Sequence, residues 1–577
     1  MSTSPLPLAD TVELAVQIEA TPGLSRLRAL FGEPDAIGPD IVAAVVEEAA
    51  KFSQSWLGPL NPRADREGCR LDDGRVRTAT GHKAAWDAYL EAGWLGIDQP
   101  HDAGGQGLPI FVLAACQELF DRGCIAFGML PTALRAAARL LAAHADEATK
   151  AEWLPKLVSG EWGATICISE PDAGSDVGRI RTLASPTDGG EWSITGEKIW
   201  ISYGDHDLAG RIGHCLLART PDAPPGAAGL SLFLVPDTAA GADGEMVRNG
   251  IVVRRLEEKL GLHGSPTCAM GFEGARGRLI GAPGRGLAQL FTMITTMRLM
   301  VAVQGLALAG GAADVALAYA EERRQGGPAD QPPVAIAEHS DIRRLLMGMV
   351  ARVQLMRGVI LAAAVHADLA RLEPDLEARE AAEALVGWLL PIAKTLGGET
   401  AFEVSSDAIQ VLGGAGYVKD WPAEQLLRDS RVFTIFEGAS GIQALDLLLR
   451  RLRRDGGKGL RAFMALARAE ISTAGGLIEA RAQERTLDLL QDAADRLSES
   501  TSDAAAYPFL RLAGLAAMGW IAVRLASMGS DDSSSQRLAA AARYWLQELE
   551  PKARLEHSLA CADPERLGLF EQVRRRR

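Results

Sequence analysis

The pattern of hydrophobic and polar residues divides the chain into helical regions on either side of a β-rich middle. Apolar residues recur at helical spacing over residues 41–52 and 82–92, and the same spacing predicts helices within residues 130–153. A glycine-rich loop over residues 99–109 interrupts these helices. We therefore expect an N-terminal helical domain over residues 1–164.

Short β-prone runs, separated by Gly, Pro and Asp, follow this domain. The runs expected to form single strands are residues 165–169, 215–219 and 230–235. A hairpin is predicted over residues 192–202, with its turn at Thr195-Gly196. Because no helix separates these runs, they predict a small antiparallel barrel or sandwich that forms a middle β domain over residues 165–285.

Helical spacing returns after the β region. The long helices that it predicts are residues 297–324, 340–369 and 376–408. They belong to an expected helical bundle over residues 286–455, which a glycine-rich linker joins to a helical extension over residues 456–577. The apolar run at residues 299–311 is too short to span a bilayer and is expected to be a buried helix. The predicted fold class is mainly α with a central β domain.

Composition and charge narrow the possible partners. Hydrophobic residues make up 47% of the chain and charged residues 23%, which is typical of a globular protein. The net charge of -14 counts against broad electrostatic binding to nucleic acid or anionic membranes. The four arginines at residues 574–577 are interpreted as a solvated tail. Neither a signal peptide nor a transmembrane segment is evident, so we expect a cytoplasmic protein.

Several common catalytic and binding motifs are missing from the sequence. The seven cysteines lack CxxC spacing, and none of the nine histidines lies in an HExxH motif, so no metal site is expected. The cysteines are interpreted as reduced core thiols. The chain also has no GxxxxGK[ST] phosphate loop, no GxGxxG after a strand and no GxSxG elbow.

The loop at residues 168–178, ISEPDAGSDVG, follows the first predicted strand. Gly174 would let backbone amides approach a phosphate, and Ser175 can donate a hydrogen bond from its hydroxyl. An ordinary turn between strands is the alternative interpretation.

A second candidate motif lies at residues 196–207, GEKIWISYGDHD. The indole of Trp200 can lie against a planar ligand such as an isoalloxazine ring, and Ser202 is expected on the same strand face. Packing of Trp200 in the core is the alternative.

The third candidate motif lies at residues 410–443, where an apolar run ends at Glu437. A carboxylate next to Ile435 and Phe436 is expected to be partly desolvated, which would raise its pKa and make it a stronger base. A surface glutamate at a turn or at a helix N-terminus is the alternative.

Together these motifs resemble those of the acyl-CoA dehydrogenase family, in the same order and over roughly residues 40 to 455. The matching segments are Ser169 to Asp176 (SEPDAGSD), Lys198 to Ser202 (KIWIS), Gln410 to Tyr417 (QVLGGAGY), Arg428-Asp429, and Phe436 to Gly438 (FEG). Within the family the chain resembles a longer subfamily that includes methylthiopropionyl-CoA dehydrogenases and has a C-terminal helical extension.

The resemblance implies a role for each matching residue. Glu437 would be the catalytic base that removes the α-proton of an acyl-CoA thioester, with FAD as the cofactor and hydride acceptor. The residues implied to bind FAD are Ile168, Ser169, Ser175, Trp200, Ser202, Arg323, Gln410 and Gly414. Those implied to bind the acyl-CoA substrate are Ser175, Arg298 and Phe436.

Three residues depart from the family pattern near this expected site. Ala439 stands where a threonine is usual, which removes a hydroxyl that would contact the cofactor. Phe436 replaces the commoner tyrosine, and Thr295 stands where an acidic residue often precedes the arginine on the CoA side. None of these changes removes the expected base.

The family resemblance implies FAD-dependent dehydrogenation in fatty acid β-oxidation, with electron transfer flavoprotein as a possible electron acceptor. Two alternatives stay open: an acyl-CoA oxidase that uses O₂, and a flavin-bearing, nucleic-acid-associated protein of the same fold. The extension would cover a surface that a second dimer buries in shorter family members, so a homodimer is expected. The acyl chain is not predicted, because pocket depth depends on several helices.

Overall fold

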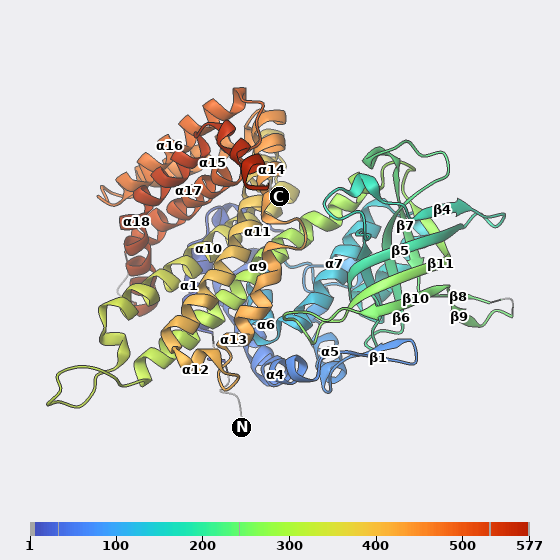
Figure 1. The fold of residues 1–577 in the computed structure, drawn as a ribbon, viewed down its shortest axis with the longest axis horizontal. Helices are drawn as coiled ribbons and strands as arrows, with labels where there is room; N and C mark the ends of the chain where they lie inside the picture. The colour runs from blue at the N-terminus through green and yellow to red at the C-terminus, as the bar shows by residue number, and fades with distance from the viewer. Residues whose placement is uncertain (1–5, 8, 33, 242, 530–531, 575–577) are drawn as a thin grey trace. The chain divides into compact units, whose positions relative to one another are not determined.

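The computed structural model describes residues 6–7, 9–32, 34–241, 243–529 and 532–574. These residues form two compact units (Figure 1). The first unit contains the described residues of Met1–Ala50, Pro109–Leu119 and Val301–Arg577, and the second contains Lys51–Leu108 and Phe120–Met300. The division into four domains expected from the sequence stays a prediction.

The first unit is helical, and its long helices match the hydrophobic periodicity. Its helices before the extension are α1 (Thr11–Glu19), α2 (Leu24–Leu30), α3 (Pro39–Phe52), α6 (Ile110–Gly123), α9 (Gly286–Glu322), α10 (Ser340–Leu372), α11 (Leu376–Leu412), α12 (Gly414–Tyr417), α13 (Ala423–Ser430) and α14 (Ser440–Leu445). Helices α3, α6 and α9 each contain residues of both units. The three predicted long helices are confirmed as parts of α9, α10 and α11. The apolar run at residues 299–311 is buried within α9, as expected.

The C-terminal extension packs against the long helices of the same unit (Figure 1). Its helices are α15 (Lys458–Thr473), α16 (Ala480–Glu499), α17 (Ala506–Ala526), α18 (Ser533–Ala560) and α19 (Phe570–Arg574). α17 contacts α10 and α11 and is buried on nearly all sides, which explains why it is apolar around its whole circumference. Gly514 of α17 leaves room for Leu396 of α11. The last three arginines lie outside the described residues.

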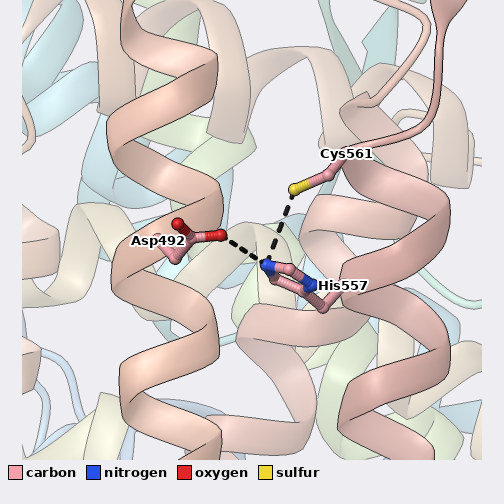
Figure 2. A group of neighbouring side chains, drawn as sticks. All are labelled: Asp492, His557 and Cys561. Atoms are coloured by element: carbon pink, nitrogen blue, oxygen red, sulfur yellow. Dashed lines mark hydrogen bonds and ion pairs between the residues drawn. The ribbon is translucent and has the colours of Figure 1, made fainter.

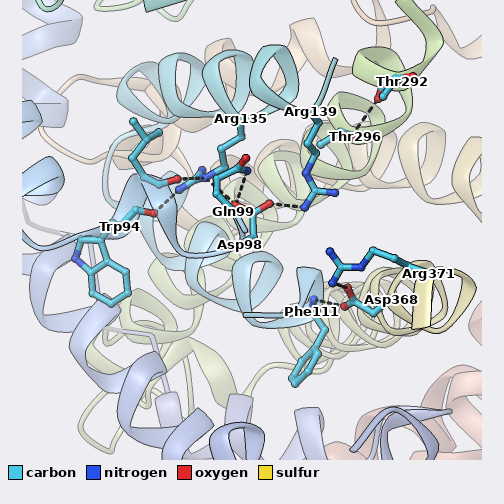
Figure 3. A network of polar contacts seen from close by, with 11 residues as sticks. Trp94, Asp98, Gln99, Phe111, Arg135, Arg139, Thr292, Thr296, Asp368 and Arg371 are labelled. Atoms are coloured by element: carbon cyan, nitrogen blue, oxygen red, sulfur yellow. Dashed lines mark hydrogen bonds and ion pairs between the residues drawn. The ribbon is translucent and has the colours of Figure 1, made fainter. Parts of the chain in front are cut away.

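The helices of the second unit are α4 (Gly58–Glu67), α5 (His82–Glu91), α7 (Ile125–His144) and α8 (Glu147–Val158). A buried charge network joins α7 to the chain that follows α5. Asp98 accepts a 2.5 Å hydrogen bond from Arg139 and lies 3.5 Å from Arg135, both on α7 (Figure 3). Burial opposes the charge of Asp98, but the two arginines hold its pKa below the usual value. Arg135 also donates to the Trp94 carbonyl, so the network ties the chain after α5 to α7.

The strands of the second unit are β1 (Arg70–Asp72), β2 (Arg75–Arg77), β3 (Trp162–Cys167), β4 (Leu183–Pro186), β5 (Trp192–Ser202), β6 (Arg211–Arg219), β7 (Leu230–Pro236), β8 (Thr238–Ala240), β9 (Met246–Arg248), β10 (Ile251–Leu256) and β11 (Thr267–Ile280). In the described residues β1 with β2 and β8 with β9 form separate two-stranded sheets, and the other seven strands form a barrel. In the described residues the main sheet runs β10-β11-β5-β4-β6-β3, and β7 pairs with both β11 and β6. This pairing closes the sheet on itself. Its interior is filled by apolar side chains such as Phe233, Phe272 and Ile194.

Three details of the sequence prediction are wrong. The barrel is not purely antiparallel, because β3 and β4 each pair with β6 in parallel. The predicted hairpin is one continuous strand, β5, and Gly196 lies in its middle. A Cβ at Gly196 would come within 2.8 Å of the Cα of Thr182, so the glycine allows close approach of the neighbouring chain and makes no turn. A small antiparallel pair, β1 and β2, lies in the region expected to be entirely helical.

Four helices in the described part of the chain are long and apolar enough to cross a membrane, judged by length and composition alone. They are α7, α9, α10 and α17, and between 72% and 94% of the most apolar stretch of each is buried inside the protein. The absence of a transmembrane segment stays a prediction. All seven cysteines are free, and five of them are buried, as expected for core thiols.

Candidate functional site

The loop that follows β3 is fixed by a buried ion pair within the second unit. The Nζ of Lys198, on β5, donates to Glu170 at 2.7 Å and to the carbonyls of Ile168 at 3.1 Å and Leu217 at 2.8 Å. Glu170 also accepts hydrogen bonds from the backbone N–H groups of Arg181 and Thr182. The loop is therefore held at its base from several directions.

Charge balance explains why this loop carries both a glutamate and a lysine. Burial lowers the pKa of Lys198, while the Glu170 charge opposes that change. Burial also works against the Glu170 charge, but Lys198 and the surrounding donors lower its pKa overall. Each group therefore offsets part of the cost of burying the other. Neither residue was assigned a role from the sequence.

The backbone of β5 presents Trp200 outward. Lys198 and Ile201 pair with residues 270 and 268 of β11, so two residues of β5 face one of β11. Trp200 lies in this β-bulge with φ +62°, and its side chain is 57% exposed. A bulky residue at positive φ is strained, and a bulge re-aims side chains, so the indole is held away from the barrel interior. Core packing of Trp200, the alternative considered from the sequence, is thereby ruled out within this unit.

The other residues expected to line the flavin lie close to Trp200. The backbone N–H of Ile199 donates to the Ser169 carbonyl at 2.9 Å, which joins the loop directly to the bulge. Ile168, Ser169 and Ser202 are half-buried, while Ile201 between Trp200 and Ser202 is buried. The structure therefore brings Ile168, Ser169 and Trp200 together along one strand and its adjoining loop.

Two further residues expected at the site lie apart from this bulge in the second unit. Ser175 is exposed in the outer part of the loop, where Asp176 forms an ion pair with Arg179. Arg298 lies on α9, and its guanidinium is 5.9 Å from the ring centre of Phe291. Thr295, one turn earlier on α9, is exposed.

In the first unit, Glu437 lies in a short loop between the turn at Arg431–Thr434 and α14. Its φ of +53° is unusual for a residue with a side chain, and the residue is half-buried. Lys394, completely buried on α11, donates to the carbonyls of Phe433 at 2.9 Å and Gly438 at 2.8 Å. Gln443 donates to the Glu437 carbonyl at 3.1 Å. These hydrogen bonds fix the backbone before and after Glu437.

Close packing also holds the start of this loop. A Cβ at Gly398 of α11 would meet the Phe433 carbonyl oxygen at 2.7 Å, so a glycine is needed where the loop crosses the helix. Phe433 is buried, and its ring lies 5.5 Å from that of Phe436. Ala439 occupies the N-cap position of α14 without a side-chain cap. A threonine at this position would be able to cap the helix.

The remaining predicted cofactor residues lie on exposed parts of the first unit. Gln410 and Gly414 flank the end of α11, and Arg323 follows the end of α9. The Arg323 carbonyl accepts a hydrogen bond from Ile336, which closes the base of an exposed loop. Tyr417, beside Gly414, is 83% exposed. Within one chain these residues make no enclosed site.

Lys394 is the functional-site residue that sequence reasoning missed most clearly. It lies in the apolar stretch GWLLPIAKTLGG of α11, where a single charged residue on a buried helix signals a specific partner. Gln443 lay inside a motif that was recognised, but no role was assigned to it. Both residues act on the backbone around Glu437, and the side-chain pattern alone does not reveal such contacts.

The sequence matches three family models along most of its length. They are the N-terminal, middle and C-terminal domains of acyl-CoA dehydrogenase, over residues 43–161, 165–275 and 284–452. The 3-methylmercaptopropionyl-CoA dehydrogenase of Ruegeria pomeroyi is 38% identical over 542 residues, which cover 90% of this chain and 92% of that protein.

Solved structures share the fold. The Caenorhabditis elegans protein ACDH-11, solved with C11-CoA, has a TM-score of 0.81 at 22% identity and covers 99% of this chain and 96% of its own. A Bacillus anthracis acyl-CoA dehydrogenase complexed with FAD has a TM-score of 0.73 at 20% identity, covering 93% of this chain and 92% of its own. These two likenesses concern the fold. The three matched domains and the Ruegeria relative show that this chain belongs to the acyl-CoA dehydrogenase family, whose members are FAD-dependent oxidoreductases.

Proposed function

We propose that the protein oxidises an acyl-CoA thioester to the trans-2-enoyl-CoA, with Glu437 as the base that removes the α-proton. The observation that carries this proposal is the anchoring of the Glu437 backbone at positive φ by Lys394 and Gln443. A strained residue whose neighbours are held on both sides is typical of a functional position. An ordinary surface glutamate at a turn needs no such support.

The residues of the second unit fit a flavin. The bulge at Trp200 leaves an indole face exposed beside the half-buried Ser202, and both lie next to the loop that contains Ser169. An aromatic face and a hydroxyl suit a planar ring that has hydrogen-bonding edges. We propose that Ile168, Ser169, Trp200 and Ser202 hold the ring, and that Ser175 contacts the phosphates. When bound, FAD supplies the acceptor for the hydride from the β-carbon.

The chain's own residues contribute to the reaction by positioning the base and by fixing the backbone on either side of it. Glu437 takes the α-proton, and the Phe433–Phe436 pair provides an apolar wall that favours the acyl chain over water. Lys394 fixes the carbonyls of Phe433 and Gly438, so the carboxylate does not have to be ordered anew at each turnover. Arg298 is proposed to contact the CoA moiety.

The decisive test is the Glu437→Gln variant of the FAD-loaded enzyme. The amide keeps the size of the side chain but cannot accept the α-proton, so turnover should fall by about 10²- to 10⁴-fold while flavin absorbance is retained. Glu403→Gln, the same change at an exposed ion pair with Arg352, is the matched control and should leave turnover unchanged. Near-normal turnover of Glu437→Gln would refute the assignment of the base.

The electron acceptor and the substrate need separate measurements. Release of hydrogen peroxide during turnover would identify an oxidase, whereas reduction of an electron transfer flavoprotein without peroxide would identify a dehydrogenase. Bleaching of the flavin by acyl-CoAs of different length and branching would show which acyl chain is preferred. The cytoplasmic location stays a prediction that cell fractionation can check.

We also propose that the protein is a homodimer. The extension covers α10 and α11 of the same unit with α17, and α18 also contacts α10. A surface that is already covered is not available to a second pair of subunits. The mass in solution, measured by light scattering, should therefore correspond to two chains, and a tetramer would contradict this proposal.

A further inference from the structure

Three side chains with metal-binding atoms meet between two helices of the extension (Figure 2). Asp492 comes from α16, His557 comes from the last turn of α18, and Cys561 directly follows the end of α18. The His557 Nε2 lies 2.7 Å from the Asp492 Oδ2 and 3.6 Å from the Cys561 Sγ. One ligand atom from each residue lies within 4.8 Å of both others, and all three residues are half-buried.

The helix geometry explains why these side chains converge. Residues four positions apart lie above one another on a helix face, so His557 and Cys561 project from α18 in the same direction. The backbone N–H of Cys561 donates to the His557 carbonyl at 2.9 Å, which keeps the cysteine in register at the helix end. α16 packs against α18 and supplies Asp492 from the opposite side. A search for CxxC or HExxH does not find this arrangement.

The distances are close to those of a zinc complex. With Zn–N near 2.05 Å, Zn–S near 2.3 Å and tetrahedral angles, the nitrogen and sulfur atoms would be about 3.5 Å apart. The observed separation of 3.6 Å already has this value. The nitrogen and carboxylate oxygen would be about 3.4 Å apart, so Asp492 would have to move back by only about 0.7 Å from its hydrogen bond with His557.

The chemical types of the three groups also suit a cation. A carboxylate oxygen, an imidazole nitrogen and a thiolate sulfur are all ligands of Zn²⁺ in proteins. Arg496 forms a 2.9 Å ion pair with the Oδ2 of Asp492 and is the competing cation beside the cluster.

We propose that Asp492, His557 and Cys561 form a zinc site that joins α16 to α18, with water as the fourth ligand. Binding removes the Sγ proton of Cys561 to solvent. In the complex the ring proton of His557 lies on Nδ1, which leaves Nε2 to bind the metal. Three protein ligands with mixed oxygen, nitrogen and sulfur atoms suit Zn²⁺ better than Mg²⁺ or Ca²⁺, which prefer oxygen ligands alone. The site is independent of the proposed catalytic function.

Metal titration of the untagged, chelator-treated, full-length holoenzyme tests this proposal. Zn²⁺ should bind with one equivalent per chain and release protons, as measured by calorimetry in buffers of different ionisation enthalpy. Co²⁺ should give the thiolate charge-transfer absorption and the visible bands of a tetrahedral complex. Magnesium at the same concentration should not displace Co²⁺.

Substitutions then assign the site to its residues. Cys561→Ser should abolish the thiolate band, and His557→Ala should weaken Zn²⁺ binding about 100-fold, because even partners beyond the ligands change affinity by 10- to 100-fold. Cys69→Ser, at the other half-buried cysteine, is the matched control and should leave the band intact. Retention of the thiolate band in Cys561→Ser, or the lack of one-to-one binding in the wild type, would overturn the proposal.

Discussion

Two buried lysines support segments that carry proposed functional residues, Lys198 in the second unit and Lys394 in the first. Neither side chain has any exposed surface. Lys198 donates to one carbonyl of the loop after β3 and to one on β6, and Lys394 donates to the carbonyls of Phe433 and Gly438. A strained residue at positive φ lies near each lysine: Trp200 at +62°, two residues after Lys198 on β5, and Glu437 at +53°, next to Gly438. The two regions differ in how the charge of the lysine is balanced.

Lys198 donates to a buried carboxylate, whereas Lys394 donates to the carbonyls of Phe433 and Gly438. Glu170 is only 6% exposed and would be left as an unpaired buried charge if Lys198 were lost. Loss of Lys394 would instead leave the carbonyls of Phe433 and Gly438 with one donor fewer. Leaving a buried charge unpaired costs more free energy than leaving a carbonyl without one of its donors. We therefore expect Lys198 to matter mainly for the folding of the loop after β3, and Lys394 mainly for the position of the backbone around Glu437.

The largest effect is expected from Lys198→Met. Removing one partner of a buried ion pair typically destabilises a protein by about 3–5 kcal/mol, and the loop that holds Ile168 and Ser169 should lose its shape with it. We expect a lower free energy of unfolding in urea, together with a loss of bound flavin. The double variant Lys198→Met/Glu170→Gln also removes the unpaired carboxylate charge of Glu170 and should recover part of the stability. A single variant with wild-type stability would show that the ion pair does not hold the loop.

A smaller loss of stability is expected from Lys394→Met. Two carbonyls that lose a donor in a buried site cost about 1–3 kcal/mol. Turnover should nevertheless fall strongly, since the backbone beside Glu437 loses its anchor, while flavin content stays unchanged. Urea unfolding, flavin absorbance and steady-state turnover separate these effects. Flavin loss equal to that of Lys198→Met would remove the contrast between the two loops.

The sequence allowed prediction of those features that depend on neighbouring residues. The long helices α9, α10 and α11 follow from the local periodicity of apolar residues. The loop after β3 is recognisable from its own Pro, Gly, Ser and Asp residues. Contacts between distant residues were not predictable in this way. Lys394 contacts residues about forty positions later in the chain. Gly196 was wrongly predicted as a turn because Thr182, whose close approach it allows, lies just before β4 and not next to it in the sequence. The bulge at Trp200 was hidden because the strand sequence continues without interruption.

The parallel pairing of β3 with β6 was missed for the same physical reason. Pairing direction depends on the path of the chain between strands, and roughly forty residues separate these two. The site was found as separate motifs, but the supports beneath Glu437 required the packing of α11 against its loop. Sequence motifs thus identified the residues proposed to contact ligands, whereas the residues that hold those motifs in place emerged from the structure.

The smallest effect is expected from relieving strain at Glu437 itself. A non-glycine residue at φ +53° carries backbone strain that glycine does not, so Glu437→Gly should be more stable than Glu437→Ala by about 1 kcal/mol. Both changes remove the carboxylate, so both variants should lose turnover equally and only their unfolding midpoints should differ. The pair Trp200→Gly and Trp200→Ala makes the same comparison on the flavin side. If the alanine variants are as stable as the glycine variants at both positions, the positive φ values do not strain the backbone. The segments around Trp200 and Glu437 would then be ordered by Lys198 and Lys394 alone.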